Sequence, residues 1–217
     1  MSEKLRQTET EQEIFWKGEF GNEYIERNNS RRLLGNKTAF YAKVINHMDK
    51  LNSCIEFGSN IGLNLMAIRN LLPECELSAI EINTKAVDAL KKQQEIRVYN
   101  QSILDFVPDF QRDLVIIHGV LIHVNPEMLN IVYQRLYNTA SKYILIVEYY
   151  NPSPVEIEYR GNREKLFKRD FAGEMLDKFK GLELVEYGFI YHRDKQFPQD
   201  DFTWFLLKKN GCEQDVK

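Results

Sequence analysis

The chain has 217 residues, 43% of them hydrophobic, and a formal net charge of −3. A chain of this length can bury the core of one α/β domain with an appended lid. The weak negative charge gives no overall attraction to a phosphate backbone, although it does not exclude a local basic groove. Nucleic acid is therefore a disfavoured partner.

The longest apolar runs, at 114–117 and 143–147, are far too short to span a bilayer, and the N-terminus is charged, unlike a signal peptide. We therefore expect a cytoplasmic protein with no membrane partner. Cys54, Cys75 and Cys212 lack the paired spacing of a zinc site and leave one cysteine over in any disulfide scheme. We expect all three to be reduced and structural.

Residues 1–12 are polar and acidic and have almost nothing to bury, so we expect them to be frayed, with order beginning near Ile14. Apolar residues at helical spacing then predict a helix over 37–48. A short apolar strand from Ser53 runs into a glycine turn, and a helix over 63–72 follows it.

A second strand over 77–82 and a helix over 84–94 continue this alternation, which predicts a parallel sheet. A later strand, counted as the fourth because one more strand is expected before residue 100, begins at Asp113 and ends at His118. Asn125-Pro126-Glu127 has the pattern of an N-cap, a first-turn proline and a first-turn acid, so we expect a helix from there to about Asn138. A fifth, doubly buried strand is expected over 143–147.

The last third of the chain changes pattern. A helix near 170–179 is followed by two strands, at 182–191 and 202–207, and strands joined by such a short connection must be antiparallel. We expect three parts: an N-terminal tail and lid (1–36), a main domain (37–209) and a C-terminal tail (210–217).

The glycine turn after the first strand carries the strongest chemical signal. Residues 53–62 read Ser-Cys-Ile-Glu-Phe-Gly-Ser-Asn-Ile-Gly. Glu81 lies near the end of the second strand, where a carboxylate can accept hydrogen bonds from both hydroxyls of a ribose. A dinucleotide fingerprint needs a third glycine, and Glu56 would face a diphosphate unfavourably. An ammonium and a sulfonium suit that carboxylate better, which indicates S-adenosylmethionine.

With these motifs the chain resembles the class I S-adenosylmethionine-dependent methyltransferases. The family's acidic-x-Gly-x-x-x-Gly pattern fits Glu56, Gly58 and Gly62, and its ribose acid fits Glu81. Asn-Gln-Ser-Ile-Leu-Asp at 100–105 resembles the segment that borders the adenine, and residues 113–123 resemble the fourth strand and the turn beneath the methionine.

The resemblance implies a Rossmann-like α/β fold with a seven-stranded, mostly parallel sheet and an antiparallel C-terminal hairpin. It also implies a set of cofactor-binding residues: Phe20, Tyr24, Glu56, Gly58, Ser59, Asn60, Gly62, Glu81, Ile82, Asn83, Ser102, Ile103, His118, Gly119 and Val120.

A narrower resemblance concerns the acceptor. The segments 15–28, 149–161 and 168–175 look like those of methylases associated with pseudaminic acid biosynthesis, which implies a sugar-related small-molecule acceptor. Mixed aromatic and basic residues on loops suit a sugar or an anionic small molecule, although the rings could equally close a core. The candidate acceptor-binding residues are Trp16, Arg27, Tyr149, Tyr150, Asn151, Arg160 and Lys168.

Two histidines stand near the predicted site. His118 ends the fourth strand at the edge where ligands bind, so it is the candidate catalytic base. His123 sits beside the helix cap and is interpreted as structural. With no flanking cysteine pair, no metal site is expected.

Other functions remain as alternatives. A DNA amino-methylase would carry an Asn-Pro-Pro-Tyr-like tetrad after strand four, where this chain has His-Gly-Val-Leu, and the Asn-Pro-Ser-Pro run at 151–154 comes one strand too late. The missing middle glycine disfavours a nicotinamide-dependent oxidoreductase. Protein methylation and a non-catalytic cofactor-binding scaffold stay open.

Overall fold

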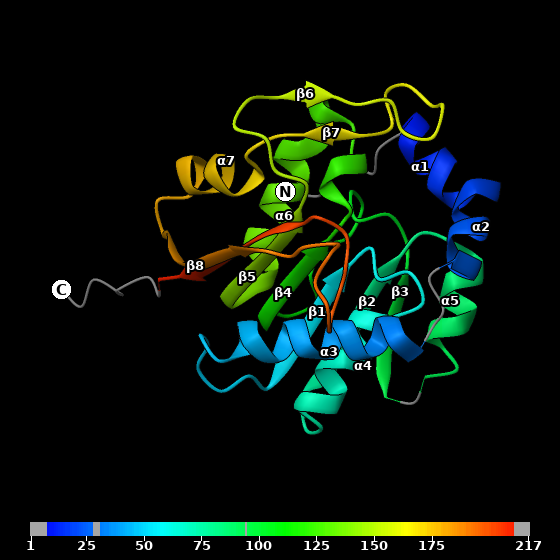
Figure 1. Cartoon of the computed structure of the whole chain (residues 1–217). Helices are drawn as coiled ribbons and strands as arrows, with labels where there is room; N and C mark the ends of the chain where they lie inside the picture. Colours follow the sequence, from blue (N-terminus) through cyan, green and yellow to red (C-terminus); the bar gives the residue numbers. More distant parts are fainter. Residues whose placement is uncertain (1–7, 28–30, 94, 211–217) are drawn as a thin grey trace.

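The computed structural model describes residues 8–27, 31–93 and 95–210, and the structure contains one central sheet of seven strands (Figure 1). The strand order is β3-β2-β1-β4-β5-β9-β8. Strands β1 to β5 are parallel, whereas β9 is antiparallel to both β5 and β8. The bounds are β1 Ser53–Phe57, β2 Glu76–Glu81, β3 Ile96–Asn100, β4 Arg112–His118, β5 Ala140–Glu148, β8 Leu182–Phe189 and β9 Thr203–Lys209. The predicted mostly parallel sheet with a C-terminal hairpin is confirmed.

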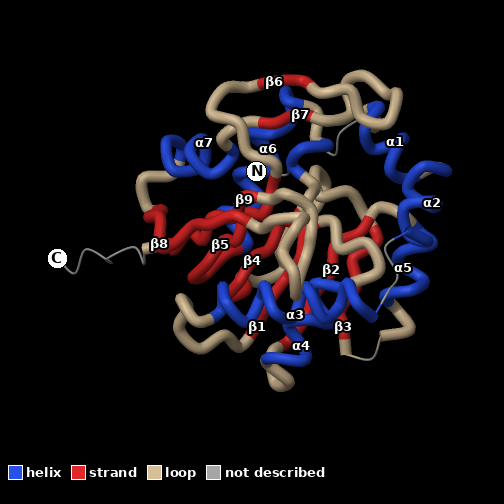
Figure 2. Tube along the Cα trace, viewed as in Figure 1, coloured by secondary structure: helices blue, strands red, loops and turns tan. Residues whose placement is uncertain are grey.

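Helices cover both faces of the sheet (Figures 1 and 2). Helices α3 (Arg31–Ile45) and α4 (Leu63–Leu71) pack on one face through residues such as Val44 and Ile68. Helices α6 (Leu129–Thr139) and α7 (Phe171–Lys178) pack on the other, for example through Leu136. Side chains alternate along each strand, so β4 sends Leu114 and Ile116 to one core and the residues between them to the other.

Several element boundaries differ from the sequence prediction. Helix α3 begins at Arg31, six residues before the predicted start, and α5 (Thr84–Leu90) is shorter than predicted. Asn125 caps its turn as predicted by accepting the Glu127 N–H at 3.0 Å, but the first turn is a 3₁₀ helix, η2 (Pro126–Met128), that leads into α6. A second small sheet, β6 (Val155–Glu156) with β7 (Phe167–Lys168), has strands too short for a sequence signal.

The expectation that the chain is frayed through Gln12 is wrong for the described residues 8–12. Helix α1 (Glu11–Lys17) starts with a capping box between Thr10 and Glu13, which satisfies backbone donors that would otherwise be exposed at the helix end. The Gln12 side chain is buried and donates to the Glu164 carbonyl at 3.0 Å. The polar residues are thus held by hydrogen bonds to a segment far along the chain. Residues 1–7 lie outside the described part.

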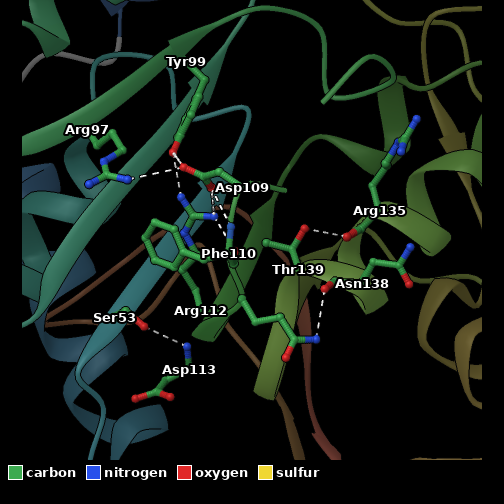
Figure 3. A network of polar contacts seen from close by, with 11 residues as sticks. Ser53, Arg97, Tyr99, Asp109, Phe110, Arg112, Asp113, Arg135, Asn138 and Thr139 are labelled. Carbon is green, nitrogen blue, oxygen red and sulfur yellow. Dashed lines mark hydrogen bonds and ion pairs between the residues drawn. The ribbon is translucent and has the colours of Figure 1, made fainter. Parts of the chain in front are cut away.

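Buried cysteines and a buried arginine complete the core. Cys54 and Cys75 are free buried thiols, and Cys212 lies outside the described residues. At the amino end of β4, the fully buried Arg112 donates to Asp109 and stacks over the Phe110 ring at 3.7 Å (Figure 3). None of the described helices is long and apolar enough to cross a membrane.

Candidate functional site

A cavity of about 710 Å³ lies over the carboxyl ends of the parallel strands. This is the edge at which open α/β sheets bind ligands. Its floor comes from the turns after β1, β2, β3 and β4. Its cover comes from α1, α2 (Glu19–Arg27), α3, residues 159–160 and the β8–β9 connection. The predicted residues that line it are Trp16, Tyr24, Gly58, Ser59, Asn60, Glu81, Ile82, Asn83, Ser102, Ile103, His118, Gly119, Val120, Tyr149 and Arg160.

The glycine turn is shaped by positive backbone φ angles at Gly58 (75°), Asn60 (48°) and Gly62 (83°). The Gly58 and Ser59 N–H groups both donate to the Ile80 carbonyl, at 2.9 and 3.0 Å, which ties the turn to β2. A Cβ atom on Gly58 would stand 2.6 Å from Val120 Cγ2, so only glycine lets these two turns come this close. Gly62 starts α4 and packs on Leu90 rather than lining the cavity.

Glu81 joins the turns after β1 and β2. Its Oε2 accepts the Asn60 N–H and its Oε1 accepts the Asn83 N–H, each at 2.7 Å. Burial raises the pKa of Glu81, although the backbone donors oppose that shift. Asn83 also caps α5 and ties the N-terminal helices α1 and α2 to the turn after β2, because its amide donates to the Trp16 carbonyl and to the Asn22 side chain.

Glu56 lies behind the cavity wall rather than in it. It is 1% exposed, it accepts a hydrogen bond from the Asn64 amide, and its Oε2 has no partner among the described residues. Burial raises the pKa of Glu56 to about 8. Asn64 in turn accepts from Lys37 Nζ at 2.7 Å, and both residues line the cavity. Glu56 is therefore connected to the cavity only indirectly, by the hydrogen bonds of Asn64 and Lys37.

The turn after β4 is held by a second buried acid. Glu148 Oε1 accepts the N–H groups of Val120 and Leu121 at 2.9 and 2.8 Å. The carboxyl is 2% exposed, and burial raises its pKa to about 8. This contact fixes the loop that carries Val120 and His123 into the cavity wall.

His118 lines the cavity at the end of β4. Its Nδ1 lies 3.2 Å from the Tyr41 hydroxyl, and its ring packs edge-on against Phe202. Burial, followed by the nearby Lys37 cation, lowers the pKa of His118 well below its usual range. The imidazole is therefore neutral at neutral pH.

His123 also lines the cavity, and its contacts come from distant segments. Its Nδ1 lies 2.5 Å from the Lys165 carbonyl, and its ring contacts Trp16 and Tyr159, at centroid distances of 4.7 and 5.0 Å. Burial lowers the pKa of His123 to about 4. The histidine interpreted as structural from sequence thus stands in an aromatic wall of the cavity.

The remaining predicted residues lie outside the cavity lining. Phe20 supports the wall from behind by contacting Tyr159, and Lys168 lies over the Tyr149 ring at 5.0 Å. Tyr150 is 41% exposed and Asn151 bonds the nearby Ser153 carbonyl. Arg27 ends α2, and its side chain lies outside the described part of the chain.

Sequence reasoning missed several residues of the segments that cover the cavity. Lys37 sat at the start of a predicted helix, and its charge was the one available signal. Tyr159 lies in a segment noted for its resemblance but was not named as a site residue, and His192, residues 198–200 and Phe202 carry no motif, yet all of these line the cavity. The connection between β8 and β9 is tied to α3 by the Asn36 amide, which donates to the Pro198 carbonyl at 2.6 Å. The described residues hold no cluster of three or more His, Cys, Asp or Glu side chains placed for a metal ion.

Comparisons with known structures identify the fold. The plantazolicin methyltransferase BpumL in complex with SAH aligns at a TM-score of 0.65 and 15% identity, over 92% of this chain and 94% of that one. Magnesium protoporphyrin IX methyltransferase from Synechocystis PCC 6803, with bound SAH, aligns at 0.64 and 11%, over 91% and 98%. The chain has the Rossmann-like fold of class I methyltransferases.

A third similar structure is the 1,6-didemethyltoxoflavin-N1-methyltransferase of Burkholderia thailandensis with bound S-adenosylhomocysteine. It aligns at a TM-score of 0.65 and 11% identity, over 88% of this chain and 84% of that one. No protein-family model matches the sequence, and no curated protein matches it by sequence. At these identities the likeness establishes the fold.

Proposed function

We propose that the chain is an S-adenosylmethionine-dependent methyltransferase acting on a small molecule. The observation that carries this proposal is Glu81, a carboxylate held by two backbone N–H groups beside a positive-φ glycine turn, in the wall of the cavity. The three similar structures named above are all methyltransferases with bound SAH.

The residues present fit this cofactor. Each carboxylate oxygen of Glu81 has a second lone pair that can accept a ribose hydroxyl. Ser102 and Ile103 line the cavity where the adenine would lie, next to Ile82. The buried acid Glu56, whose Oε2 has no described partner, would attract the positive charge of the methionine end once ionised, and a bound cation would favour that ionisation against the effect of burial. A volume of about 710 Å³ also leaves room for an acceptor, since small-molecule sites span roughly 300–1,000 Å³.

Methyl transfer suits a site that mainly aligns the acceptor with the methyl group and excludes water from both. When bound, S-adenosylmethionine supplies a methyl group on a sulfonium, and transfer is an in-line displacement. The chain's own task is to hold the acceptor against that methyl group and to exclude water. We infer three parts: an N-terminal tail and lid (1–36), in which α1 and α2 cover the cavity, a main domain (37–209) and a C-terminal tail (210–217). Residues 1–7, 28–30, 94 and 211–217 of these parts lie outside the described residues.

We infer that the acceptor is a sugar-derived metabolite, of a nonulosonic acid or nucleotide-sugar pathway. Support comes from the rings that line the cover, Trp16, Tyr149 and Tyr159, because aromatic faces stack on sugar rings. Arg160 in the same wall can bind a carboxylate or phosphate. The similar structures act on small molecules according to their names, namely plantazolicin, magnesium protoporphyrin IX and didemethyltoxoflavin.

Calorimetric titration with S-adenosylhomocysteine and with NAD tests the cofactor. Glu81→Ala should weaken S-adenosylhomocysteine binding by about tenfold to a hundredfold, the scale of lost hydrogen bonds to a charged group. Glu81→Gln keeps the shape of the side chain and should weaken binding too. Glu183→Gln, at an exposed position on β8, is the matched control and should leave binding unchanged. Binding of NAD alone would overturn the proposal, and binding of neither would favour a non-catalytic scaffold.

A screen with labelled methyl donor tests the acceptor. It should include nucleotide sugars, acidic sugars, peptides and oligonucleotides. Label transfer to a sugar is the expected result, whereas transfer to peptides or oligonucleotides alone would contradict the inference of a small-molecule acceptor.

A further inference from the structure

Two histidines line the cavity, and the structure gives their Nδ1 atoms opposite kinds of partner. The His123 Nδ1 partner is the Lys165 carbonyl, at 2.5 Å. The His118 Nδ1 partner is the Tyr41 hydroxyl, at 3.2 Å. A neutral imidazole has one N–H donor and one acceptor nitrogen, so the partner of Nδ1 decides what Nε2 can do.

The tautomer of His123 follows from its partner. A carbonyl oxygen can only accept, so Nδ1 of His123 must carry the proton and donate it. Nε2 is then left with a free lone pair. None of the described residues forms a hydrogen bond with Nε2, which is also not among the fully buried unpaired atoms. Because His123 lines the cavity, this lone pair is available to a ligand.

The tautomer of His118 follows in the same way. The Tyr41 side chain is fully buried, and His118 Nδ1 is the one hydrogen-bond partner of its hydroxyl within the described part of the chain. A buried hydroxyl proton without an acceptor is costly, so Tyr41 donates to Nδ1. His118 therefore presents an N–H donor at Nε2 and has no free lone pair to take a proton.

We propose that His123, through Nε2, is the catalytic base of this site, that His118 serves as a hydrogen-bond donor to the bound ligands, and that the acceptor group is a hydroxyl. The proposal rests on the function proposed above. It reverses the roles that the sequence suggests for the two histidines. A hydroxyl acceptor must lose its proton as the new bond forms and so needs such a base, whereas a carboxylate has no proton to lose.

The step balances with the groups named. A bond forms between the acceptor oxygen and the methyl carbon while the carbon–sulfur bond of the sulfonium breaks and leaves the thioether. The acceptor O–H bond breaks, and its proton goes to the His123 Nε2 lone pair. The imidazolium later releases the proton to water.

The surroundings of His123 suit this task. Trp16 and Tyr159 contact the ring at 4.7 and 5.0 Å, and the Lys165 carbonyl fixes its rotation. Burial holds the pKa at about 4, so the lone pair is free at neutral pH. Such a weak base is sufficient because the acceptor proton becomes acidic as the bond to the methyl carbon forms.

Histidine nitrogen NMR tests the tautomers directly. Proton–nitrogen correlation spectra of the ¹⁵N-labelled full chain, with S-adenosylhomocysteine added, should show Nδ1–H for His123 and Nε2–H for His118. Single His→Asn variants at positions 47, 118, 123 and 192 assign the signals. The opposite tautomer at His123 would overturn the proposal. So would a crystal structure with S-adenosylhomocysteine in which Nε2 of His123 points away from the homocysteine sulfur.

Substitution separates the base from its anchor. In His123→Asn the amide can still donate to the Lys165 carbonyl, but no base remains. Transfer to the hydroxyl-bearing acceptor found in the screen should lose about 100-fold or more in kcat, the scale of general-base catalysis, while S-adenosylhomocysteine affinity stays within about threefold. Unchanged kcat would overturn the role of His123. Failure of the unmodified chain to bind S-adenosylhomocysteine would instead overturn the proposed function. The two failures can be told apart, because the histidine tautomers can also be measured in the absence of S-adenosylhomocysteine.

Discussion

Replacing Gly58 with alanine tests whether the close approach of two turns shapes the cavity. Gly58 has φ +75°, a conformation that L-residues rarely adopt. An added Cβ would lie 2.6 Å from Cγ2 and 3.1 Å from Cγ1 of Val120. Val120 cannot easily turn aside, because valine is stiff at χ1 and its backbone N–H is held by Glu148.

Two costs therefore add at this position. The left-handed backbone costs an L-residue about 1–2 kcal/mol. Overpacking a contact of this kind costs about 1–3 kcal/mol. We expect Gly58→Ala to lower the free energy of unfolding by about 2–5 kcal/mol and to weaken S-adenosylhomocysteine binding, because the turn must shift.

Gly161 provides a matched control for the backbone term. Its φ is +80°, and an added Cβ would meet nothing within 4 Å, so Gly161→Ala should cost about 1–2 kcal/mol from strain alone. In a Val120→Ala background, Gly58→Ala should approach the Gly161→Ala value. Urea unfolding measures the free energy of unfolding of each variant, which falls by roughly 2 kcal/mol per molar urea. Equal losses for Gly58→Ala and Gly161→Ala in the native background would refute the argument from contact with Val120.

Three further predictions concern charges and caps. Hydrogen bonds from Tyr99 and Arg112 lower the pKa of Asp109 in the folded state, so stability is present above its unfolded pKa and is lost as pH falls; Asp109→Asn should flatten this acid loss in unfolding measured from pH 6 to 3. Glu148 has the opposite effect: burial raises its folded pKa to about 8, so stability should fall as pH rises from about 4.5 to 8. Glu148→Gln, whose carbonyl can still accept both N–H groups, should remove the contribution of Glu148 to that fall and leave the contribution of Glu56, whose pKa is raised in the same way. A steeper alkaline loss in that variant would contradict the assignment. Thr10→Ala removes the capping box and should raise amide exchange across 11–17 by the equivalent of about 0.5–2 kcal/mol, with no change at α3 as internal control.

The parallel sheet could be predicted because its strands are apolar runs bounded by turn residues. Residues 114–117 are buried on both faces, so their sequence is almost purely aliphatic. The glycine turn and Glu81 could be predicted for a similar reason, since the φ angles and the strand-end acid depend on residues within one βα unit. Local signals of this kind were enough to predict most of the residues that form the cavity floor.

The boundaries that were predicted wrongly depend on contacts from elsewhere in the chain. Residues 8–12 have no apolar pattern, and the burial of Gln12 depends on a hydrogen bond to Glu164. Helix α3 extends back to Arg31, and Asn36 in that extension bonds the β8–β9 connection. Polar side chains that make such distant contacts give no hydrophobic periodicity to detect.

The sequence by itself determined the order of strands and helices, the glycine turn and the acid that follows β2, because each is encoded in neighbouring residues. Only the tertiary structure decided how the two histidines are oriented. The Nδ1 partner of His123 lies 42 residues later, and that of His118 lies 77 residues earlier. A proton sits on one ring nitrogen or the other according to the group that faces it, and folding alone brings that group into place.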